Sequence, residues 1–257
     1  MGMSLFDLSG KSAVITGSSR GIGKAIAIAM AEQGARVTIS SRKPEPCAET
    51  AQEINDRFGE GTAISVPANI SSKEDLQNLV DETNAAFGKI DIVVCNAASN
   101  PYYGSLAGIS DEQFQKILSN NVVANNWLIS MVLPQMKERK DGAVVIISSI
   151  GGLKGSPVIG AYNISKAADF QLARNLCVEH GKDNVRINCI APGLIRTDFA
   201  KALWENPDTL KRALAYTPMD RIGEPHEIAG AAVFLASDAG AYMNGQMMVI
   251  DGGQTIT

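Results

Sequence analysis

The sequence predicts an α/β protein in which a doubly wound, seven-stranded parallel sheet carries helices on both faces. Three observations predict this fold. Seven short runs rich in Val and Ile recur along the chain without polar alternation, as is typical of strands buried on both faces. Longer segments of helical periodicity separate the runs, which indicates right-handed β–α–β crossovers. No repeat or low-complexity linker divides the 257 residues, so we expect one domain over residues 1–257.

The expected strands and helices alternate in order along the chain. The strands, each a short run of mostly β-branched residues, lie at 13–15, 36–40, 63–66, 91–94, 143–147, 185–190 and 247–250. The helices, each with helical spacing of apolar residues, lie at 21–33, 45–58, 72–87, 111–137, 157–180 and 225–237. The Ser71-Ser72 pair and Ser110 precede acidic first turns, which favours serine N-caps for two of these helices.

Residues 194–220 interrupt this alternation. The segment separates the sixth strand from the last helix, and its large apolar residues are Phe199, Leu203, Trp204, Leu210, Leu214 and Tyr216. A long excursion that follows the carboxyl end of a strand is typical of a lid or binding loop. We expect a substrate lid here; the alternative is a surface helical hairpin with a small core of its own.

Composition excludes several classes of protein. A chain that is 45% hydrophobic and 19% charged is not disordered, and 23 basic against 27 acidic residues argue against non-specific nucleic-acid binding. No apolar run approaches the roughly 18–20 residues of a membrane span. Four scattered cysteines without a C-x-x-C pair, with only two histidines, indicate reduced thiols and no metal site. We expect a cytoplasmic protein with a small-molecule substrate and neither nucleic-acid nor membrane partners.

A glycine-rich turn follows the first expected strand and reads Thr16-Gly-Ser-Ser-Arg-Gly-Ile-Gly23. Its first glycine permits a tight exit from the strand, its second lets the backbone approach a diphosphate, and its third lets the helix pack close to the sheet. The N-terminus of that helix supplies free N–H groups and a positive dipole end. At the first strand–helix junction of a β–α–β chain this predicts a Rossmann dinucleotide site; a plain tight turn is the alternative. The candidate contacts are Gly17, Ser19, Arg20, Gly21, Ile22 and Gly23.

The end of the second expected strand indicates which dinucleotide binds. NAD sites usually place an acidic residue there to bind the ribose 2′-hydroxyl, but this chain reads Ser40-Ser41-Arg42-Lys43. Arg20 in the glycine turn would face the same corner, and arginine binds phosphate in a bidentate manner. We therefore expect NADPH/NADP as the cofactor, with Ser41, Arg42 and Lys43 near the 2′-phosphate. The alternative is that Arg42 and Lys43 belong to a solvated loop.

A second set of residues indicates acid–base chemistry. Ser149 follows the fifth expected strand, and Tyr162 and Lys166 stand four residues apart on one face of the next helix. A free tyrosine has a pKa near ~10, and a neighbouring ammonium group lowers it. Tyr162 would then donate a proton to a carbonyl oxygen that Ser149 orients, while a nicotinamide delivers hydride. Tyrosine and lysine at this spacing are common, and the serine and the glycine turn make the pattern specific.

Taken together, the glycine turn with Ser149, Tyr162 and Lys166 resembles the short-chain dehydrogenase/reductase family over essentially the whole chain. The resemblance implies that Asn121 is a catalytic residue that holds a water, that Lys166 also binds the nicotinamide ribose, and that the chain forms a homotetramer through helices 111–137 and 157–180. Ala98 and Asn69 stand where the family often has Gly and Asp. The further cofactor contacts that it implies are Asn69, Ile70, Asn96, Ala97, Ala98, Pro192, Gly193, Ile195 and Thr197.

The stretch 95–104, the Tyr162–Lys166 motif and Leu203-Trp204 resemble the subgroup of NADPH-dependent carbonyl and retinal reductases known from animal peroxisomes. This resemblance implies a medium-sized apolar or aromatic ketone, aldehyde or diketone, or the matching alcohol. Ser149 and Tyr162 would contact its reacting oxygen. The other candidate substrate contacts are Asn100, Tyr102, Leu153, Val158, Phe199, Leu203 and Trp204.

Two other functions remain open. A 3-oxoacyl-[acyl-carrier-protein] reductase would present a basic surface to its acidic carrier, and the expected lid contains the basic residues Arg196, Lys201, Lys211 and Arg212. A non-catalytic NADP-binding regulatory protein would share the fold, because fold alone does not prove activity. The intact Ser149, Tyr162 and Lys166 argue against the second alternative.

Overall fold

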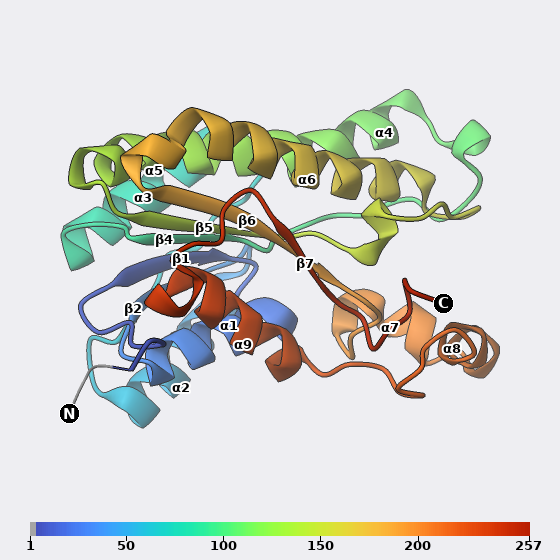
Figure 1. Ribbon diagram of the computed structural model, residues 1–257, viewed down its shortest axis with the longest axis horizontal. Helices are drawn as coiled ribbons and strands as arrows, with labels where there is room; N and C mark the ends of the chain where they lie inside the picture. The colour runs from blue at the N-terminus through green and yellow to red at the C-terminus, as the bar shows by residue number, and fades with distance from the viewer. Residues whose placement is uncertain (1–3) are drawn as a thin grey trace.

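The computed structural model describes residues 4–257, which form a seven-stranded sheet in the order β3-β2-β1-β4-β5-β6-β7 (Figure 1). Every pairing between neighbouring strands is parallel. The chain builds β1, β2 and β3 outward and then returns to place β4 beside β1. This reversal is the switch point at which α/β sheets bind their ligands. The strands are β1 (Ser12–Thr16), β2 (Arg36–Ser40), β3 (Ala63–Ser65), β4 (Ile92–Cys95), β5 (Gly142–Ile147), β6 (Val185–Pro192) and β7 (Met247–Ile250).

Helices cover both faces of the sheet, so the expected doubly wound fold is confirmed. Figure 1 shows α1, α2 and α9 below the sheet and α3, α4, α5 and α6 above it. The helices are α1 (Gly21–Glu32), α2 (Pro44–Phe58), α3 (Lys73–Phe87), α4 (Asp111–Leu118), α5 (Ala124–Arg139), α6 (Gly160–His180), α7 (Lys201–Trp204), α8 (Pro207–Leu214) and α9 (Pro225–Ala236).

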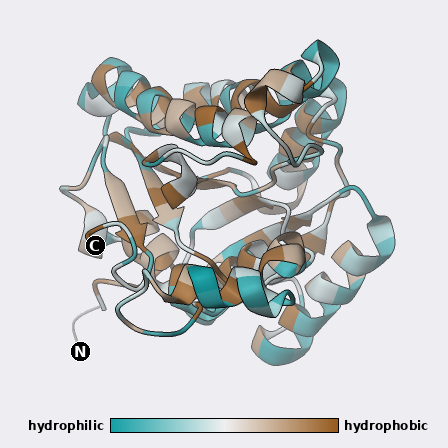
Figure 2. Ribbon diagram, turned by 90° about the vertical axis from the view of Figure 1, so that its right-hand side faces the viewer, coloured by the Kyte–Doolittle hydropathy of each residue, from teal (hydrophilic) through white to brown (hydrophobic). Residues whose placement is uncertain are grey.

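The core consists of two apolar layers, one on each face of the sheet. Successive residues of a strand point to opposite faces. Ala13 and Ile15 therefore join the layer between the sheet and helices α1 and α9, whereas Val14 joins the layer between the sheet and helices α3 and α5. Because both faces are covered, every residue of β1 is buried. This is why the strand sequences lack polar alternation. Figure 2 shows apolar segments gathered along the strands and the inner sides of the helices.

Two of the expected helices differ from the structure by more than one residue at a boundary. The single helix expected at 111–137 is divided by a π-helical segment, Ser119–Val123, which lies between α4 and α5. A local π-turn inserts an extra residue and redirects side chains, and such turns are frequent at functional sites. The helix expected from 157 begins at Gly160. Ser72 and Ser110 are the N-caps of α3 and α4, and both accept a backbone N–H.

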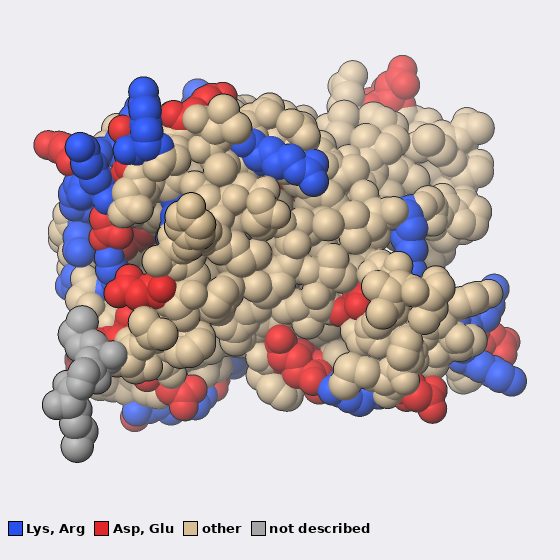
Figure 3. Space-filling model, in the orientation of Figure 1, with Lys and Arg blue, Asp and Glu red and all other residues tan. Residues whose placement is uncertain are grey.

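Residues 194–220 form two short helices, α7 and α8, beyond the carboxyl ends of β6 and β7 (Figure 1). Arg196 N donates to Gly223 O and Gly223 N to Leu194 O, both at 2.9 Å, and Arg221 pairs with Glu227 of α9 at 2.6 Å, so both ends of the segment are fastened. Within the segment, Trp204 Nε1 donates to Thr197 O at 2.9 Å. The charged side chains seen in Figure 3 lie mostly around the periphery of the viewed face, and its centre is nearly free of them. No helix within residues 4–257 is long and apolar enough to cross a membrane.

Candidate active site

The expected catalytic residues meet at the carboxyl end of the sheet. Ser149 follows β5, and Tyr162 and Lys166 lie in the first turns of α6. The Ser149 hydroxyl lies close enough to Tyr162 to lower the pKa of the tyrosine, and Lys166 Nζ lies 5.7 Å from the centre of the tyrosine ring. Phe199, from the segment 194–220, packs against Tyr162 with 6.1 Å between ring centres. The fold thus brings three of the expected catalytic residues and one candidate substrate contact together.

The acidity of Tyr162 differs from the simple expectation. Burial raises the pKa of the Tyr162 hydroxyl, Lys166 lowers it, and the Asp169 carboxylate raises it; the sum lies above the ordinary value of 10.0. The expectation that Lys166 lowers this pKa is correct for the lysine itself. It is wrong for the net shift of the pKa, because burial and the Asp169 charge outweigh the effect of Lys166. A neutral Tyr162 at physiological pH is the form that donates a proton.

Lys166 is almost completely enclosed. Its side chain is 2% exposed, and Nζ donates to Ile147 O at 2.9 Å and to Asp169 Oδ2 at 3.1 Å. Burial alone lowers the pKa of a lysine, but the nearby Asp169 and Tyr162 together raise the pKa of Lys166 above its ordinary value. Lys166 therefore carries a positive charge beside the Tyr162 ring.

Asn121 sits in the π-helical segment, fully buried. Its Oδ1 accepts from Ser99 N at 2.8 Å, and its Nδ2 donates to Ser99 O and to Ser165 Oγ, both at 3.0 Å. Ser165 Oγ in turn donates to Tyr162 O at 2.7 Å. Asn121 therefore joins the loop after β4 to the first turns of α6, within the same cluster as Tyr162 and Lys166.

The glycine turn forms a close-packed cradle. A side chain at Gly23 would place its Cβ 2.4 Å from Gly17 O and 2.5 Å from Asn96 Nδ2, and Gly17 itself has a positive φ of 66°. Asn96 Nδ2 donates to Thr16 O at 2.9 Å and to Gly17 O at 3.0 Å, which ties the turn to the end of β4. The side chain of Arg20, the N-cap residue of α1, makes no capping hydrogen bond with the described residues, so the first N–H groups of the helix are available to an anion. These features fit the diphosphate of a dinucleotide.

The segment after β6 reaches the same turn. The ideal Cβ of Gly21 would lie 3.4 Å from Thr197 Cγ2. Arg196 N donates to Gly223 O at 2.9 Å and Gly223 N to Leu194 O at 2.9 Å, and these bonds fix the strand-like backbone around Ile195. Pro192 and Gly193, at the end of β6, and Ile195 and Thr197 thus lie along one path from the sheet edge to the glycine turn.

The corner expected to hold the 2′-phosphate is basic and open. Arg42 and Lys43 are exposed after β2, and Ser41 lies half-buried with its Oγ 3.0 Å from Cys47 Sγ. Arg20 extends toward segment 194–220 and pairs with Asp198 at 3.2 Å. Asn69, after β3, is exposed, and its Oδ1 accepts from Ser71 N at 3.1 Å.

The remaining candidate substrate contacts differ in their surroundings. Tyr102 donates to Ser105 O at 3.0 Å within its own loop, and Trp204 donates to Thr197 O, so both hydroxyl and indole donors are already used. The Asn100 Oδ1 atom is buried and has no hydrogen-bond partner among the described residues. The three other apolar candidates are exposed or half-buried around this end of the sheet: Leu153, Val158 and Leu203.

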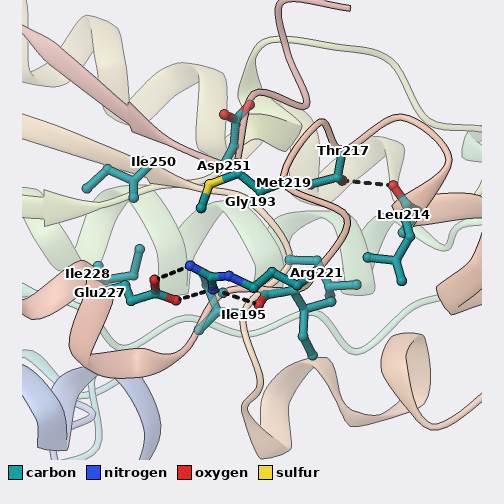
Figure 4. Close-up of a pocket in the computed structure, with 15 residues that line it drawn as sticks. Gly193, Ile195, Leu214, Thr217, Met219, Arg221, Glu227, Ile228, Ile250 and Asp251 are labelled. Carbon is teal, nitrogen blue, oxygen red and sulfur yellow. Dashed lines mark hydrogen bonds and ion pairs between the residues drawn. The ribbon is translucent and has the colours of Figure 1, made fainter.

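A small cavity lies between α8 and the ends of β6 and β7, and none of these candidate substrate contacts lines it (Figure 4). Its volume is about 70 Å³, room for about two waters, whereas ligand pockets span several hundred Å³. Figure 4 shows the Arg221–Glu227 ion pair on one side and Met219 with Asp251 on another. Met219, Arg221 and Glu227 carry no local sequence signal for this cavity, because only the folded chain brings the loop before α9 back to the sheet. No group of three potential metal ligands occurs within residues 4–257.

A parallel sheet with a glycine cradle at its switch point and a Ser–Tyr–Lys set at its carboxyl edge defines a dinucleotide-dependent oxidoreductase. Known proteins agree with this class. The family model described as enoyl-(acyl carrier protein) reductase matches residues 17–255. Bovine (Bos taurus) dehydrogenase/reductase SDR family member 4 is 40% identical over 247 residues, which cover 96% of this chain and 88% of the relative. Human (Homo sapiens) dehydrogenase/reductase SDR family member 2, mitochondrial, is 37% identical over 249 residues, with 96% and 88% covered.

Solved structures with bound cofactors are also similar. A gluconate 5-dehydrogenase from Burkholderia cenocepacia in complex with NADP and tartrate has a TM-score of 0.93 and 30% identity, with 99% of each chain covered. A 7α-hydroxysteroid dehydrogenase complexed with NADH and 7-oxo glycochenodeoxycholic acid has a TM-score of 0.93 and 33% identity, with 98% and 97% covered. This chain belongs to the short-chain dehydrogenase/reductase family.

Proposed function

We propose that this protein is an NADPH-dependent carbonyl reductase that reduces ketones or aldehydes and, in reverse, oxidises the matching alcohols. The observation that carries the proposal is the cluster of Ser149, Tyr162, Lys166 and Asn121 at the end of the sheet that also holds the glycine cradle. The four residues lie on three different elements, Ser165 links Asn121 to the backbone of Tyr162 by hydrogen bonds, and the enclosed ammonium group of Lys166 lies beside the Tyr162 ring.

Each residue has a chemical role in this proposal. Tyr162 donates its hydroxyl proton to the carbonyl oxygen, or accepts a proton from the alcohol in reverse. Ser149 orients that oxygen by a second hydrogen bond. Lys166 stabilises the tyrosinate that remains and offers its third N–H to the cofactor ribose. Asn121 fixes the loop that borders the site. The nicotinamide supplies or accepts hydride when it is bound.

The preference for NADPH rests on charge at the end of β2. Residues 40–43 contain no acid to bind a ribose 2′-hydroxyl, and exposed Arg42 and Lys43 offer two cations to a 2′-phosphate. Arg20 would add a third cation by exchanging Asp198 for the phosphate. Related structures contain NADP in one case and NADH in another, so the choice of cofactor depends on the residues of this chain.

The substrate class follows from Phe199. This aromatic residue packs on Tyr162, and therefore borders the place where the carbonyl oxygen must lie. We propose that segment 194–220 is the substrate lid and that it favours medium-sized apolar or aromatic carbonyl compounds. Asn100, whose buried Oδ1 has no partner among the described residues, would bind a polar group of the substrate. The matching relatives of the SDR family member 4 type support a general reductase of this kind.

We also propose that the chain assembles as a homotetramer in the cytoplasm. Val178 on α6 and Val249 on the edge strand β7 are exposed apolar side chains. They lie on elements next to the weakly charged centre of the face in Figure 3. Burying this edge against a second copy would remove apolar surface from water and cover an unpaired strand.

A 3-oxoacyl-[acyl-carrier-protein] reductase is the second candidate, because the matching family model is described as an enoyl-(acyl carrier protein) reductase, whose substrate is attached to the same kind of carrier. An acidic carrier needs a basic surface at the mouth of the site. Two of the cations in the lid are already paired, Arg196 with Glu224 at 2.9 Å and Lys201 with Glu205 at 3.4 Å. Because these acids neutralise the surface that the carrier would contact, the small-carbonyl reductase is the better proposal.

The test is oxidation of NADPH, and of NADH in parallel, against a panel of apolar ketones, aldehydes, α-diketones and a 3-oxoacyl thioester. Turnover of small carbonyls with NADPH supports the proposal. Activity confined to the thioester moves the protein to fatty-acid synthesis. Tight NADPH binding without any turnover would favour a non-catalytic NADP-binding protein.

A further inference from the structure

Asp169 is a fully buried carboxylate that the proposed mechanism does not use. It lies on α6, one turn after Lys166, on a face whose other buried members include Phe170, Ala173 and Leu176. Burying an ion pair costs more free energy than burying apolar side chains of similar size, so stability alone does not explain a carboxylate here. Its contacts indicate another role.

One oxygen of Asp169 fixes the catalytic lysine. Lys166 Nζ has three N–H donors; one bonds to Asp169 Oδ2 at 3.1 Å and another to Ile147 O at 2.9 Å. These two acceptors come from α6 itself and from β5, so they hold the ammonium from two directions. The third donor remains for the site beside the Tyr162 ring.

The second oxygen reaches toward Asn121. Asn125 Nδ2 donates to Asp169 Oδ1 at 3.2 Å and also to Asn121 O at 2.6 Å, across the boundary between the π-helical segment and α5. One carboxylate is therefore in contact with Lys166 directly and with the turn of Asn121 through a single side chain. Lys166 lies beside the Tyr162 ring, and Asn121 is linked to the backbone of Tyr162 through Ser165.

We propose that Asp169 is a positioning residue for the reaction: its two oxygens hold Lys166 and, through Asn125, the turn of Asn121 in the arrangement that serves Tyr162. This inference rests on the proposed reductase function and adds a residue to it. Asp169 acts through Lys166 and Asn125 and has no contact of its own with the reacting carbonyl.

The charges around Lys166 make the role measurable. Tyr162 and Asp169 face it from α6, and the thiols of Cys95 on β4 and Cys189 on β6 face it from the side of the sheet that α6 covers. Burial raises the pKa of both thiols, so they stay neutral. Burial raises the pKa of Asp169, and the charge of Lys166 opposes that rise. The Asp169 charge raises the pKa of Tyr162 and of Lys166 alike.

Removing the Asp169 charge therefore lowers the pKa of Tyr162 and the pKa of Lys166. The direction of the shift is the same whichever of the two loses its proton first. The first ionisation of the coupled Tyr162–Lys166 pair moves to lower pH in Asp169→Asn. We expect the pH at which alcohol oxidation reaches half its maximum to fall by about one unit or more, because a charge within about 4–6 Å shifts a pKa by that amount. We also expect kcat to fall about tenfold or more, since a small displacement of a catalytic group costs at least that much, with the KM of the carbonyl substrate nearly unchanged.

Asp91→Asn is the matched control. Asp91 is also a buried carboxylate, paired with Lys89 at 3.1 Å and Arg139 at 3.5 Å, but it precedes β4 at the opposite edge of the sheet. Its loss should lower the melting temperature and leave the pH profile in place. Asn125→Ala is the second variant: it keeps both charges and removes the bridge to Asn121, so kcat should fall several-fold with the pH profile unmoved.

The proposal is overturned if Asp169→Asn keeps the wild-type pH profile, or if it changes only stability, as Asp91→Asn does. If Asp169→Asn does not fold, wild-type kcat in Asn125→Ala overturns the proposal instead. Lack of turnover in the wild type would refute the proposed function separately. The ionisation of Tyr162 would then be followed by ultraviolet difference spectra, with Tyr162→Phe as the blank. If Tyr162 ionises with the same midpoint pH in wild type and in Asp169→Asn, the proposed role of Asp169 is overturned.

Discussion

The fit of helix α1 against the glycine turn depends on the absence of one side chain. In Gly23→Ala the new Cβ would lie 2.4 Å from Gly17 O and 2.5 Å from Asn96 Nδ2, about 1 Å inside ordinary contact. Overpacking of this kind costs about 1–3 kcal/mol. The Asn96 bonds to Thr16 O and Gly17 O would also weaken, at about 1 kcal/mol each, and alanine's higher helix propensity returns about 1 kcal/mol. The net loss is about 2–4 kcal/mol of the free energy of unfolding.

Differential scanning calorimetry and NADPH fluorescence titration measure this prediction. A loss of this size lowers the melting temperature by about 5–10 °C, and the distorted cradle weakens NADPH binding. Gly230→Ala is the matched control, because Gly230 also lies inside a helix, α9, where an added Cβ meets no atom within 4 Å. It should raise the free energy of unfolding by about 0.5–1 kcal/mol. Equal stability and equal NADPH affinity for Gly23→Ala and wild type would refute the close-packed cradle.

Three further predictions concern Arg42 near the expected 2′-phosphate, Trp204 in segment 194–220, and the Arg221–Glu227 ion pair that follows this segment. Arg42→Asp should weaken NADPH binding about tenfold to a hundredfold, because it removes a charge-assisted bond worth about 1.5–3 kcal/mol. The ratio of kcat/KM with NADPH to kcat/KM with NADH should fall; an unchanged ratio contradicts the assignment of Arg42 to the 2′-phosphate. Trp204→Phe removes the donor to Thr197 O. It should raise the KM of the carbonyl substrate several-fold with little change in melting temperature. An unchanged KM in steady-state assays argues against segment 194–220 as the substrate lid. Arg221 holds the pKa of Glu227 at about 2, below its ordinary value of 4.5, so this pair stabilises the fold above about pH 4.5 and loses that effect as the pH falls toward 2. Thermal melts of Glu227→Gln should depend less steeply on pH than wild type between pH 4.5 and 2; parallel curves contradict the pairing.

Much of the fold could be predicted because its signals are local. Strands such as β1 and β2 are short β-branched runs. The glycines of the first turn are needed by the backbone of the turn and by its contact with the end of the neighbouring strand β4. Tyr162 and Lys166 share a helix face, so their meeting follows from spacing alone. Ser149 could be added because β5 and α6 are consecutive in the chain. Right-handed crossovers predict helices on both faces of the sheet, whereas the order of its strands is known only from the structure.

The remainder depends on contacts between segments far apart in the sequence. The π-helical segment at Ser119–Val123 coincides with bonds from Asn121 to Ser99 and Ser165, which no local pattern in α4 or α5 reveals. Asp169 was passed over because an acidic residue on a helix is usually solvated. Only the packing of α6 on β5 and β6 buries it. Tyr102 and Trp204 were expected to face the substrate, and their donors instead bind backbone oxygens of nearby residues.

The central claim is that Tyr162 transfers the proton in an NADPH-dependent reduction, and Tyr162→Phe tests it most directly. The measurement is the single-turnover rate of NADPH oxidation with the best carbonyl of the panel, for wild type and variant, together with NADPH affinity by fluorescence. Loss of a general acid predicts a rate about a hundredfold to ten-thousandfold lower in the variant, with NADPH affinity nearly unchanged, because the cradle is intact. A variant that reduces the carbonyl at the wild-type rate would contradict the account.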